Sequence, residues 1–466
     1  MSLIIPANTL AASGYAVDNS CRFNGTNDSL NLTTGTPTDA KKFTFSTWLK
    51  KCKNGVEQDL MAYNPSGNAE SMIRIDDSDR FVINDRDASD TDVEFFLVSN
   101  AVLRDASAWY NLIVAVDTTD GTNTNRVKMY INGTQVTSLQ TATYPEQNIT
   151  PEISAGSRAV YVGARVTSQF FNGYLAETVF IDGQQLAADS FGEFDSDSGI
   201  WKPIDVSGLT FGDNGFYFEY SDSSDLGVNS KGTDWTPNNL AAIDQSTDTC
   251  TNNFATINGL DFDSNATLSD GNLSITTSTG GDTIYGYSNF GVMSGKYYIE
   301  AKQLLDTAVS IIGVDLMTNC ANNVRTNTNI GNTGVTYRGD GQKRIVGTNS
   351  SFGSSYGQND IVSIALDMDN YKVYFAKNGV YQGSGNPSNG TNGLDLSSIS
   401  GYNADFIGIA FGDYNSSDSS SWQLNFGSPP FAISSGNADG DGYGNFEYAV
   451  PSGYYSLNTK NLAEYG

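Results

Sequence analysis

The sequence contains no histidine, and this absence restricts the chemistry available to the protein. Without an imidazole there is no usual general base near neutral pH, no Ser-His or Cys-His nucleophile pair, and no histidine ligand for zinc. Any catalysis would have to rest on carboxylates, tyrosine or lysine.

Cysteine is scarce and scattered. The chain has four cysteines, Cys21, Cys52, Cys250 and Cys320, and no two of them have CxxC spacing. Isolated thiols of this kind are typical of small buried side chains. We expect neither a disulfide framework nor a cysteine metal site.

Basic residues and long apolar runs are also few. Lys+Arg number 25 against 52 Asp+Glu, so the formal net charge is −27. A chain this acidic repels nucleic acid and anionic membranes, which excludes nucleic acid as an expected partner. No apolar run approaches the roughly 20 residues of a membrane span, and the N-terminus lacks the basic and apolar regions of a signal peptide. We expect no membrane insertion, and synthesis in a cytoplasm.

What the sequence does contain is typical of β structure. It has 48 glycines, 12% aromatic residues, many short polar residues and no long helical periodicity. Within residues 109–136, a strand over 110–116 is apolar at almost every position, which predicts burial on both of its faces. The next strand, 127–131, ends at Asn132-Gly133, a strong hairpin signal. Residues 361–379 repeat this plan and end at Asn378-Gly379, so the sequence predicts two β domains.

The predicted fold class is all-β, with two antiparallel β-sandwich (jelly-roll) domains joined by an irregular ordered bridge. At 466 residues the chain is too long for one core. The bridge is too rich in aromatic residues for a flexible linker. The predicted parts are an N-terminal lead-in (1–20), a first sandwich (21–190), the bridge (191–265), a second sandwich (266–432) and a C-terminal tail (433–466).

Each predicted sandwich resembles a known family. Residues 15–190 contain RFNGTNDSLNL, FTFSTWLK, WYNLIVAVD, MYINGTQV and NGYLAETVFIDGQQL, and these segments resemble the concanavalin-A-like lectin and laminin-G family. The second sandwich contains GKYYIEAK, IIGVDL, NDIVSIALDMDNYKVYFAKNGV, FIGIAF and NFGSPPF, and it resembles a SPRY domain. The SPRY resemblance implies a recognition module, not an enzyme, in which loops at one end bind protein segments.

The whole arrangement, with DWTPNNL and TNNFATIN in the bridge and PSGYYSLNTKNL near the end, resembles structural proteins of tailed bacteriophages, especially marine ones. This resemblance implies a virion protein assembled in the host cytoplasm, with other virion proteins as partners. It implies a tail fibre or appendage that recognises host-surface carbohydrate or protein, and a homo-oligomer that is a trimer by analogy. The alternatives are a capsid-decoration or head-fibre protein and a virion glycanase, which the missing histidine disfavours.

An acidic row, EFDSD, is the candidate catalytic motif that the glycanase alternative would need. On a strand, Glu193, Asp195 and Asp197 would share one face at a spacing of ~7 Å. Retaining glycosidases hold their two carboxyls about 5–5.5 Å apart. The row also precedes Ser198-Gly199, where strand character has gone. We interpret it as a solvated loop.

A second acidic segment, NADGDGYG, resembles the first half of an EF-hand calcium loop. Its candidate calcium ligands are Asp439 and Asp441, but position twelve of the loop is Tyr448 instead of a bidentate Glu. A glycine-rich turn is the simpler interpretation, and calcium binding is the alternative. The same choice, with polar loops preferred, applies to Asp76, Asp77 and Asp79, and to Asp117 with Asp120.

Two tryptophans of the predicted bridge are the candidate ligand-binding residues. Trp201 and Trp235 lie outside the predicted strands, so their rings are the candidates for stacking on a sugar. Packing between domains is the preferred interpretation of both, and sugar binding is the alternative. Trp109 and Trp422 begin predicted strands and are expected in the core.

Overall fold

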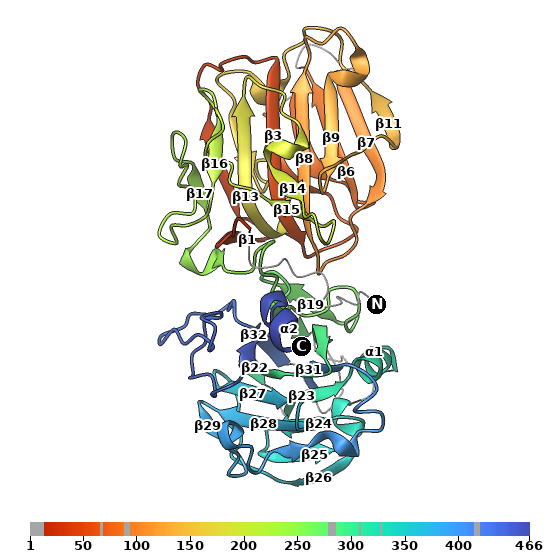
Figure 1. The fold of residues 1–466 in the computed structure, drawn as a ribbon, viewed down its shortest axis with the longest axis vertical. Coiled ribbons are helices and arrows are strands. Elements are labelled where there is room, and N and C mark those ends of the chain that lie inside the picture. Colours follow the sequence, from red (N-terminus) through yellow and green to blue (C-terminus); the bar gives the residue numbers. More distant parts are fainter. Residues whose placement is uncertain are drawn as a thin grey trace. The chain divides into compact units, whose positions relative to one another are not determined.

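Figure 1 shows the protein as a computed structural model. The structure describes residues 14–65, 69–87, 94–277, 286–306, 309–326, 329–413 and 420–466. The chain forms two compact units, one ending at Thr251 and the other running from Asn252 to Gly466. Both units consist of sheets that are antiparallel except for one short parallel pairing in the second unit, with little helix, which confirms the all-β prediction. Residues 1–13 of the predicted lead-in lie outside the described residues.

The first unit is a sandwich of two sheets. One sheet has the order β10-β9-β8-β3-β13-β1-β18, with β16 also paired to β13, and the other has the order β11-β7-β6-β5-β4-β12-β2-β17. The strands of the first sheet are β1 (Ser20–Asn24), β3 (Lys42–Lys51), β8 (Trp109–Asp117), β9 (Val127–Ile131), β10 (Thr134–Gln135), β13 (Asn172–Asp182), β16 (Phe216–Phe218) and β18 (Gln245–Ser246). Those of the second are β2 (Ser29–Thr33), β4 (Gln58–Tyr63), β5 (Glu70–Ile75), β6 (Arg80–Arg86), β7 (Phe95–Val102), β11 (Leu139–Thr143), β12 (Ala159–Val162) and β17 (Thr236–Asn238).

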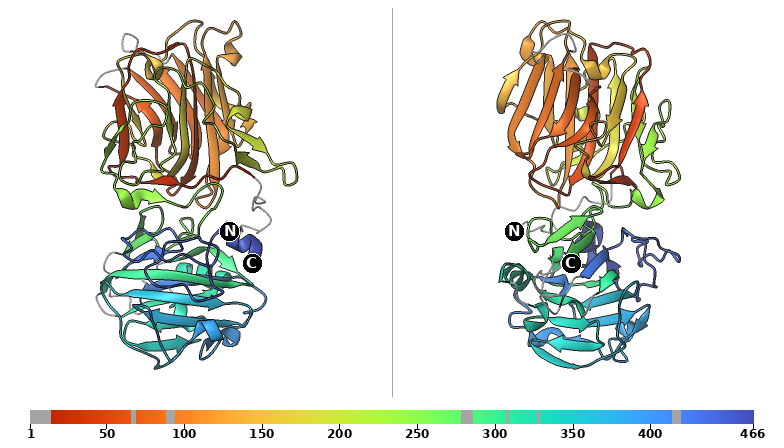
Figure 2. Two further views of the ribbon diagram at one scale, coloured as in Figure 1. Left: turned by 60° about the vertical axis from the view of Figure 1, so that its left-hand side comes forward. Right: turned by 180° about the vertical axis from the view of Figure 1, so that it is seen from behind.

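Strand β8 shows why the first sheet is apolar on both sides. Figure 2 shows the two sheets of this sandwich packed face to face. Leu112 and Val114 belong to the core between them. Ile113 and Ala115 point to the opposite face, where they pack in a second apolar cluster with residues from the segment 186–217. The prediction that this strand is buried on both faces is confirmed.

The structure places residues 191–251 of the predicted bridge in the first sandwich. Strand β16 pairs with β13, β17 with β2, and β18 with β1. The hairpin of β14 (Gly192–Phe194) and β15 (Trp201–Pro203) lies over β8 and β9 in Figure 1. These strands have two or three residues each, so they carry no alternation that a sequence pattern could reveal.

The second unit is also a two-sheet sandwich. One sheet has the order β19-β20-β32-β22-β27-β28-β29, with β30 paired to β28 and β33 to β22, and the other has the order β21-β31-β23-β24-β25-β26. Their strands are β19 (Ala266–Ser269), β20 (Ser274–Thr277), β21 (Gly286–Val292), β22 (Lys296–Asp306), β23 (Ser310–Leu316), β24 (Val335–Arg338), β25 (Gln342–Ile345), β26 (Thr348–Ser351), β27 (Ile361–Asp367), β28 (Lys372–Lys377), β29 (Val380–Tyr381), β30 (Leu394–Asp395), β31 (Ile407–Asp413), β32 (Ser420–Asn425) and β33 (Tyr455–Ser456).

The outer faces of this second sandwich are covered as well. Helix α1 (Met317–Thr326) packs on one sheet through Cys320 and Val324. The C-terminal segment packs on the other sheet through Phe446 and Tyr454, and it ends in the short helix α2 (Thr459–Tyr465). In the described part of the chain no helix is long and apolar enough to cross a membrane. Cys21, Cys52 and Cys320 are buried and Cys250 is half-buried, as expected of small isolated thiols.

Candidate functional site

The first sandwich has a hollow of about 540 Å³ on its outer face. Three segments form it: the turn between β9 and β10, the short 3₁₀ helix Ala188–Ser190, and the β14–β15 hairpin. We call it the Trp201 hollow. The residues that matter for its chemistry are Tyr130, Gly133, Asp189, Glu193, Phe194 and Trp201.

Trp201 is fixed in one position at the bottom of this hollow. Its indole Nε1 donates a hydrogen bond of 3.0 Å to the Asn111 side-chain oxygen on β8. The ring passes so close to two glycines that an added Cβ would lie 2.2 Å from its Cε3 at Gly133 and 2.5 Å from its Cζ2 at Gly192. Gly133 therefore has two roles, because its φ of 74° closes the hairpin and its missing side chain seats the indole.

Phe194 supplies the exposed apolar surface of the hollow. Its side chain is 54% exposed, whereas Trp201 is only 7% exposed. The two rings meet edge to face, with centroids 4.9 Å apart. A rigid aromatic surface of this kind offers stacking area to a ligand at little cost in conformational entropy.

The acidic row next to Phe194 forms a turn that Lys202 closes. The Lys202 ammonium lies 3.2 Å from Glu193 Oε1 and 3.3 Å from Asp195 Oδ2. Asp195 Oδ1 accepts hydrogen bonds from the backbone N–H groups of Ser198 and Asp197. These bonds, with that of Lys202, lower the pKa of Asp195 to about 2. Asp195 therefore stabilises an exposed turn, as the solvated-loop interpretation predicts, while Glu193 stays exposed at the edge of the hollow.

The other predicted ligand-binding residue, Trp235, lies in the core. It is 3% exposed and its ring packs edge to face on Phe216 and Phe218, with centroids 4.7 and 5.4 Å away. No ring face remains for a sugar, so the prediction for Trp235 is corrected to core packing. An isolated tryptophan between polar residues looks the same in sequence whether a short strand buries it or not.

In the structure the Asp439 carboxylate, a candidate calcium ligand in the alternative interpretation, is hydrogen-bonded to protein donors. Its Oδ1 accepts the N–H groups of Asp441 and Tyr443. Its Oδ2 accepts the backbone N–H and hydroxyl of Ser456 and the amide of Asn461. These donors occupy the directions in which a cation would approach, so Asp439 ties the C-terminal segment together. Across the described ranges, no group of three or more Cys, Asp or Glu side chains is arranged to hold a metal.

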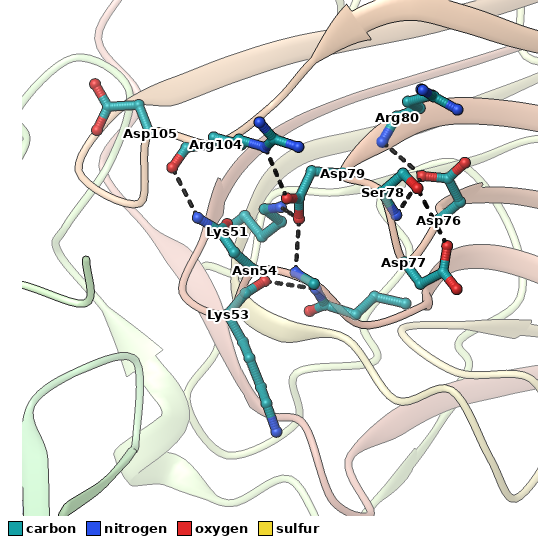
Figure 3. Close-up of polar contacts among 12 residues, drawn as sticks. Lys51, Lys53, Asn54, Asp76, Asp77, Ser78, Asp79, Arg80, Arg104 and Asp105 are labelled. Atoms are coloured by element: carbon teal, nitrogen blue, oxygen red, sulfur yellow. Dashed lines mark hydrogen bonds and ion pairs between the residues drawn. The ribbon is translucent and has the colours of Figure 1, made fainter. Parts of the chain in front are cut away.

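The acidic loop at residues 76–79 likewise contacts protein cations (Figure 3). Asp79 Oδ1 lies 2.5 Å from the Lys51 ammonium and accepts the Gly55 N–H, and its Oδ2 lies 3.2 Å from Arg104 Nε. Burial alone would raise the pKa of Asp79, but the Lys51 and Gly55 hydrogen bonds lower it below its ordinary value. Asp76 caps the same turn through the N–H groups of Ser78 and Arg80.

The loop that contains Asp117 and Asp120 is built in the same way. Asp117 accepts from Thr119 and pairs with Lys42 at 3.2 Å, and Asp120 accepts the Thr122 N–H. Like residues 76–79, it is a polar loop held by protein donors, as the sequence analysis prefers.

From the sequence, Trp201 is a ring that could stack on a sugar, but the structure buries that ring, which is 7% exposed and packs in an apolar cluster beneath the hollow. Sequence reasoning missed Phe194, Tyr130 and Gly133 as parts of the same hollow. Phe194 carries a usable signal, because it is a single aromatic residue inside an acidic, solvated segment. Tyr130 and Gly133 belong to the hairpin that the sequence predicts, and only the fold shows that the β14–β15 hairpin lies over it.

Comparison with known proteins supports the fold of the first unit. Residues 24–189 match the family model of the concanavalin A-like lectin/glucanases superfamily. No curated protein matches the chain.

Several solved structures are similar at low identity. The SPRY domain of human HERC1 is 18% identical, with a TM-score of 0.26, and the match covers 34% of this chain and 91% of that one. A putative carbohydrate binding protein from Bacteroides ovatus is 12% identical, with a TM-score of 0.31, covering 48% of this chain and 58% of that one. The heptameric SAP-like pentraxin from Limulus polyphemus is 12% identical, with a TM-score of 0.29, covering 42% and 93%.

Proposed function

We propose that the protein is a non-enzymatic recognition protein whose first sandwich binds a glycan in the Trp201 hollow. The observation that carries this proposal is the exposed Phe194 ring, held edge to face against the fixed indole of Trp201. Glycan sites combine an apolar platform for a sugar ring with a few polar groups that contact its hydroxyls. The lectin-like fold of the surrounding sandwich supports the same function.

The polar groups of the hollow are placed for this task. Glu193 and Asp189 are exposed at its edge and can accept hydrogen bonds from hydroxyl groups. Trp201 cannot rotate, because Asn111 holds its N–H and the two glycines surround its ring. Binding therefore immobilises few side chains, which lowers its entropic cost.

A glycan array tests this function directly. We expect the wild-type protein to bind a restricted set of glycans, and Phe194→Ala to lose most of that signal. Val102→Ala is the matched control, because Val102 is another exposed apolar residue of the same sandwich and does not line the hollow. Equal signals from the wild type and Phe194→Ala would refute the site.

The absence of catalysis is a separate part of the proposal. Asp195 is engaged in its own turn, where hydrogen bonds lower its pKa, and Glu193 is paired with Lys202, so neither carboxyl is free to protonate a leaving group. Prolonged incubation with the glycans bound on the array should release no reducing ends. Release that disappears in Glu193→Gln would show that the protein is a glycanase.

For the biological setting, we propose a structural protein of a tailed phage, in a tail fibre or related appendage that recognises a host-surface glycan or protein. The segments DWTPNNL, TNNFATIN and PSGYYSLNTKNL support this setting through their resemblance to phage structural proteins. Its partners would be other virion proteins and further copies of itself, in a trimer by analogy. A capsid-decoration or head-fibre role is the alternative.

Two experiments test this setting. Gold-labelled antibody should mark the tail of the particle, and labelling of the head would favour the decoration role. Purified protein added to host cells before infection should slow phage adsorption, whereas Phe194→Ala should not. Wild-type protein that neither binds cells nor slows adsorption at saturation would refute host recognition.

A further inference from the structure

A second hollow, of about 380 Å³, lies elsewhere on the first sandwich. Loops following β1 and β3 and the loop preceding β13 enclose it, and it shares no lining residue with the Trp201 hollow. We call it the rim hollow. Its lining includes Gly25, Lys53, Glu57, Gln169, Phe170 and Asn172.

Ion pairs and hydrogen bonds hold the rim hollow rigid. The Asp59 carboxylate, whose side chain is fully buried, lies 2.8 Å from Arg165 Nε, and Glu57 pairs with Arg165 and with Arg74. The Gln58 side-chain oxygen accepts the Asn172 N–H at 2.8 Å. The loops are therefore pre-organised before any ligand binds.

The backbone of the loop before β13 is strained at two positions. Val166 has a φ of 56° and Gln169 a φ of 46°, although side chains with a Cβ, and β-branched ones above all, disfavour the left-handed region. Such strain persists only where surrounding contacts enforce it, and it is concentrated at ligand sites. Here it turns Gln169 and Phe170 to the hollow.

The rim hollow carries one cation in addition to matched acidic and basic groups. Glu57 and Asp59 are matched by Arg74 and Arg165. Lys53 is exposed, and no described residue forms an ion pair or hydrogen bond with its ammonium. In Figure 3 its side chain extends away from the contacts around Asp79. A chain with a net charge of −27 thus presents one uncompensated cation beside a rigid hollow.

We propose that the rim hollow binds an acidic saccharide. The Lys53 ammonium would contact a carboxylate or sulfate group, the half-exposed Phe170 ring would pack on the sugar, and the Gln169 amide would bond its hydroxyls. This site does not depend on the Trp201 hollow. The two sites together would let one sandwich contact two parts of a charged surface polysaccharide, with a gain in avidity.

Calorimetric titration of the full chain with trigalacturonate, and with a neutral galactose trisaccharide, tests the proposal. We expect the acidic probe alone to bind, more weakly as salt rises. Lys53→Gln and Phe170→Ala should each weaken binding by roughly tenfold or more, and Lys53→Arg should restore most of it. Lys128→Gln is the control, because it removes the same charge from strand β9 of the same sandwich.

The outcomes separate the two sites. Phe194→Ala should leave trigalacturonate binding unchanged, so loss of one site does not imply loss of the other. No binding of the acidic probe, equal binding of the neutral probe, or full binding by a Lys53→Gln protein with unchanged thermal unfolding would each overturn the proposal.

Discussion

The position of Trp201 depends on a glycine that leaves space for its ring as much as on the side chain that binds it. Gly133 closes the β9–β10 hairpin and leaves room for the indole, and Asn111 fixes the indole N–H. The sequence shows Asn132-Gly133 only as a turn signal. Its second role, which is to leave space for the indole, is visible only in the folded structure, where the β14–β15 hairpin lies over the turn.

Gly133→Ala should therefore be more destabilising than a glycine replacement at an ordinary turn. Its Cβ would lie 2.2 Å from Trp201 and would also require a positive φ. Gly199→Ala is the control, since Gly199 has a similar φ of 70° with no atom within 4 Å of the added Cβ. We expect Gly199→Ala to cost about 1 kcal/mol and Gly133→Ala roughly 2–4 kcal/mol in urea denaturation. Equal costs would contradict the seating of the indole.

Glu177 should make stability depend on pH. It is 6% exposed at a bulge of β13, and it accepts the hydroxyls of Tyr217 and Tyr15 at 2.7 and 3.3 Å. Burial raises its pKa to about 7, above the ordinary value of 4.5. The folded protein then holds a proton that the unfolded chain releases, so this contribution is complete below about pH 4.5 and is lost as pH rises through about 7.

Urea denaturation across this pH range measures the effect. We expect the free energy of unfolding to fall from acidic to neutral pH, and Glu177→Gln to flatten part of the fall. Burial raises the pKa of Asp85 to about 7 as well, so some of the slope will remain. Glu146→Gln, at an exposed position, should keep the full slope. An unchanged slope in Glu177→Gln would exclude Glu177 as its source.

At the scale of elements, the C-terminal segment is held to the second sandwich by one buried carboxylate. Glu300 on β22 is fully buried and accepts the backbone N–H groups of Glu447 and Tyr448 at 2.9 and 2.8 Å. The Tyr298 hydroxyl donates to it as well, at 3.0 Å. These bonds add to the packing of Phe446 and Tyr454 on the same face of the sheet.

Glu300→Gln should therefore loosen this segment. The amide replaces one acceptor oxygen by a donor, which leaves a buried N–H without its partner at a cost of about 1–3 kcal/mol. Hydrogen exchange should rise in residues 434–458 more than in β27 or β28. Glu464→Gln, at an exposed position in α2, should change neither exchange nor stability. Increased exchange spread evenly over the sandwich would indicate general destabilisation instead.

The elements that sequence could predict are those long enough to show a pattern. The side chains of β8 point alternately into two apolar cores, and Asn-Gly turns follow β9 and β28. These patterns allowed both sandwiches to be predicted from the sequence. Strands β14 to β18 have two or three residues each, and their pairing depends on distant strands. For the same reason the sequence could not show that Trp235 is buried, because nothing near it in the sequence reveals that β17 pairs with β2.

At the scale of the whole molecule, the protein combines two sandwiches with a strongly negative charge. A charge of −27 keeps such a protein soluble and repels most polyanions. In the proposed function, recognition of a surface polysaccharide would then rely on local sites, an aromatic one at the Trp201 hollow and a cationic one at Lys53. Individual sites of this kind are weak, and an oligomer would strengthen them by avidity.

Binding at the Trp201 hollow is the central claim, and calorimetric titration of the array-selected glycan tests it most directly. We predict that Phe194→Ala weakens the affinity of the wild-type chain by roughly tenfold, or ~1.4 kcal/mol, with unchanged thermal unfolding. Val102→Ala should bind as the wild type does. Wild-type affinity in the Phe194→Ala protein would contradict the claim.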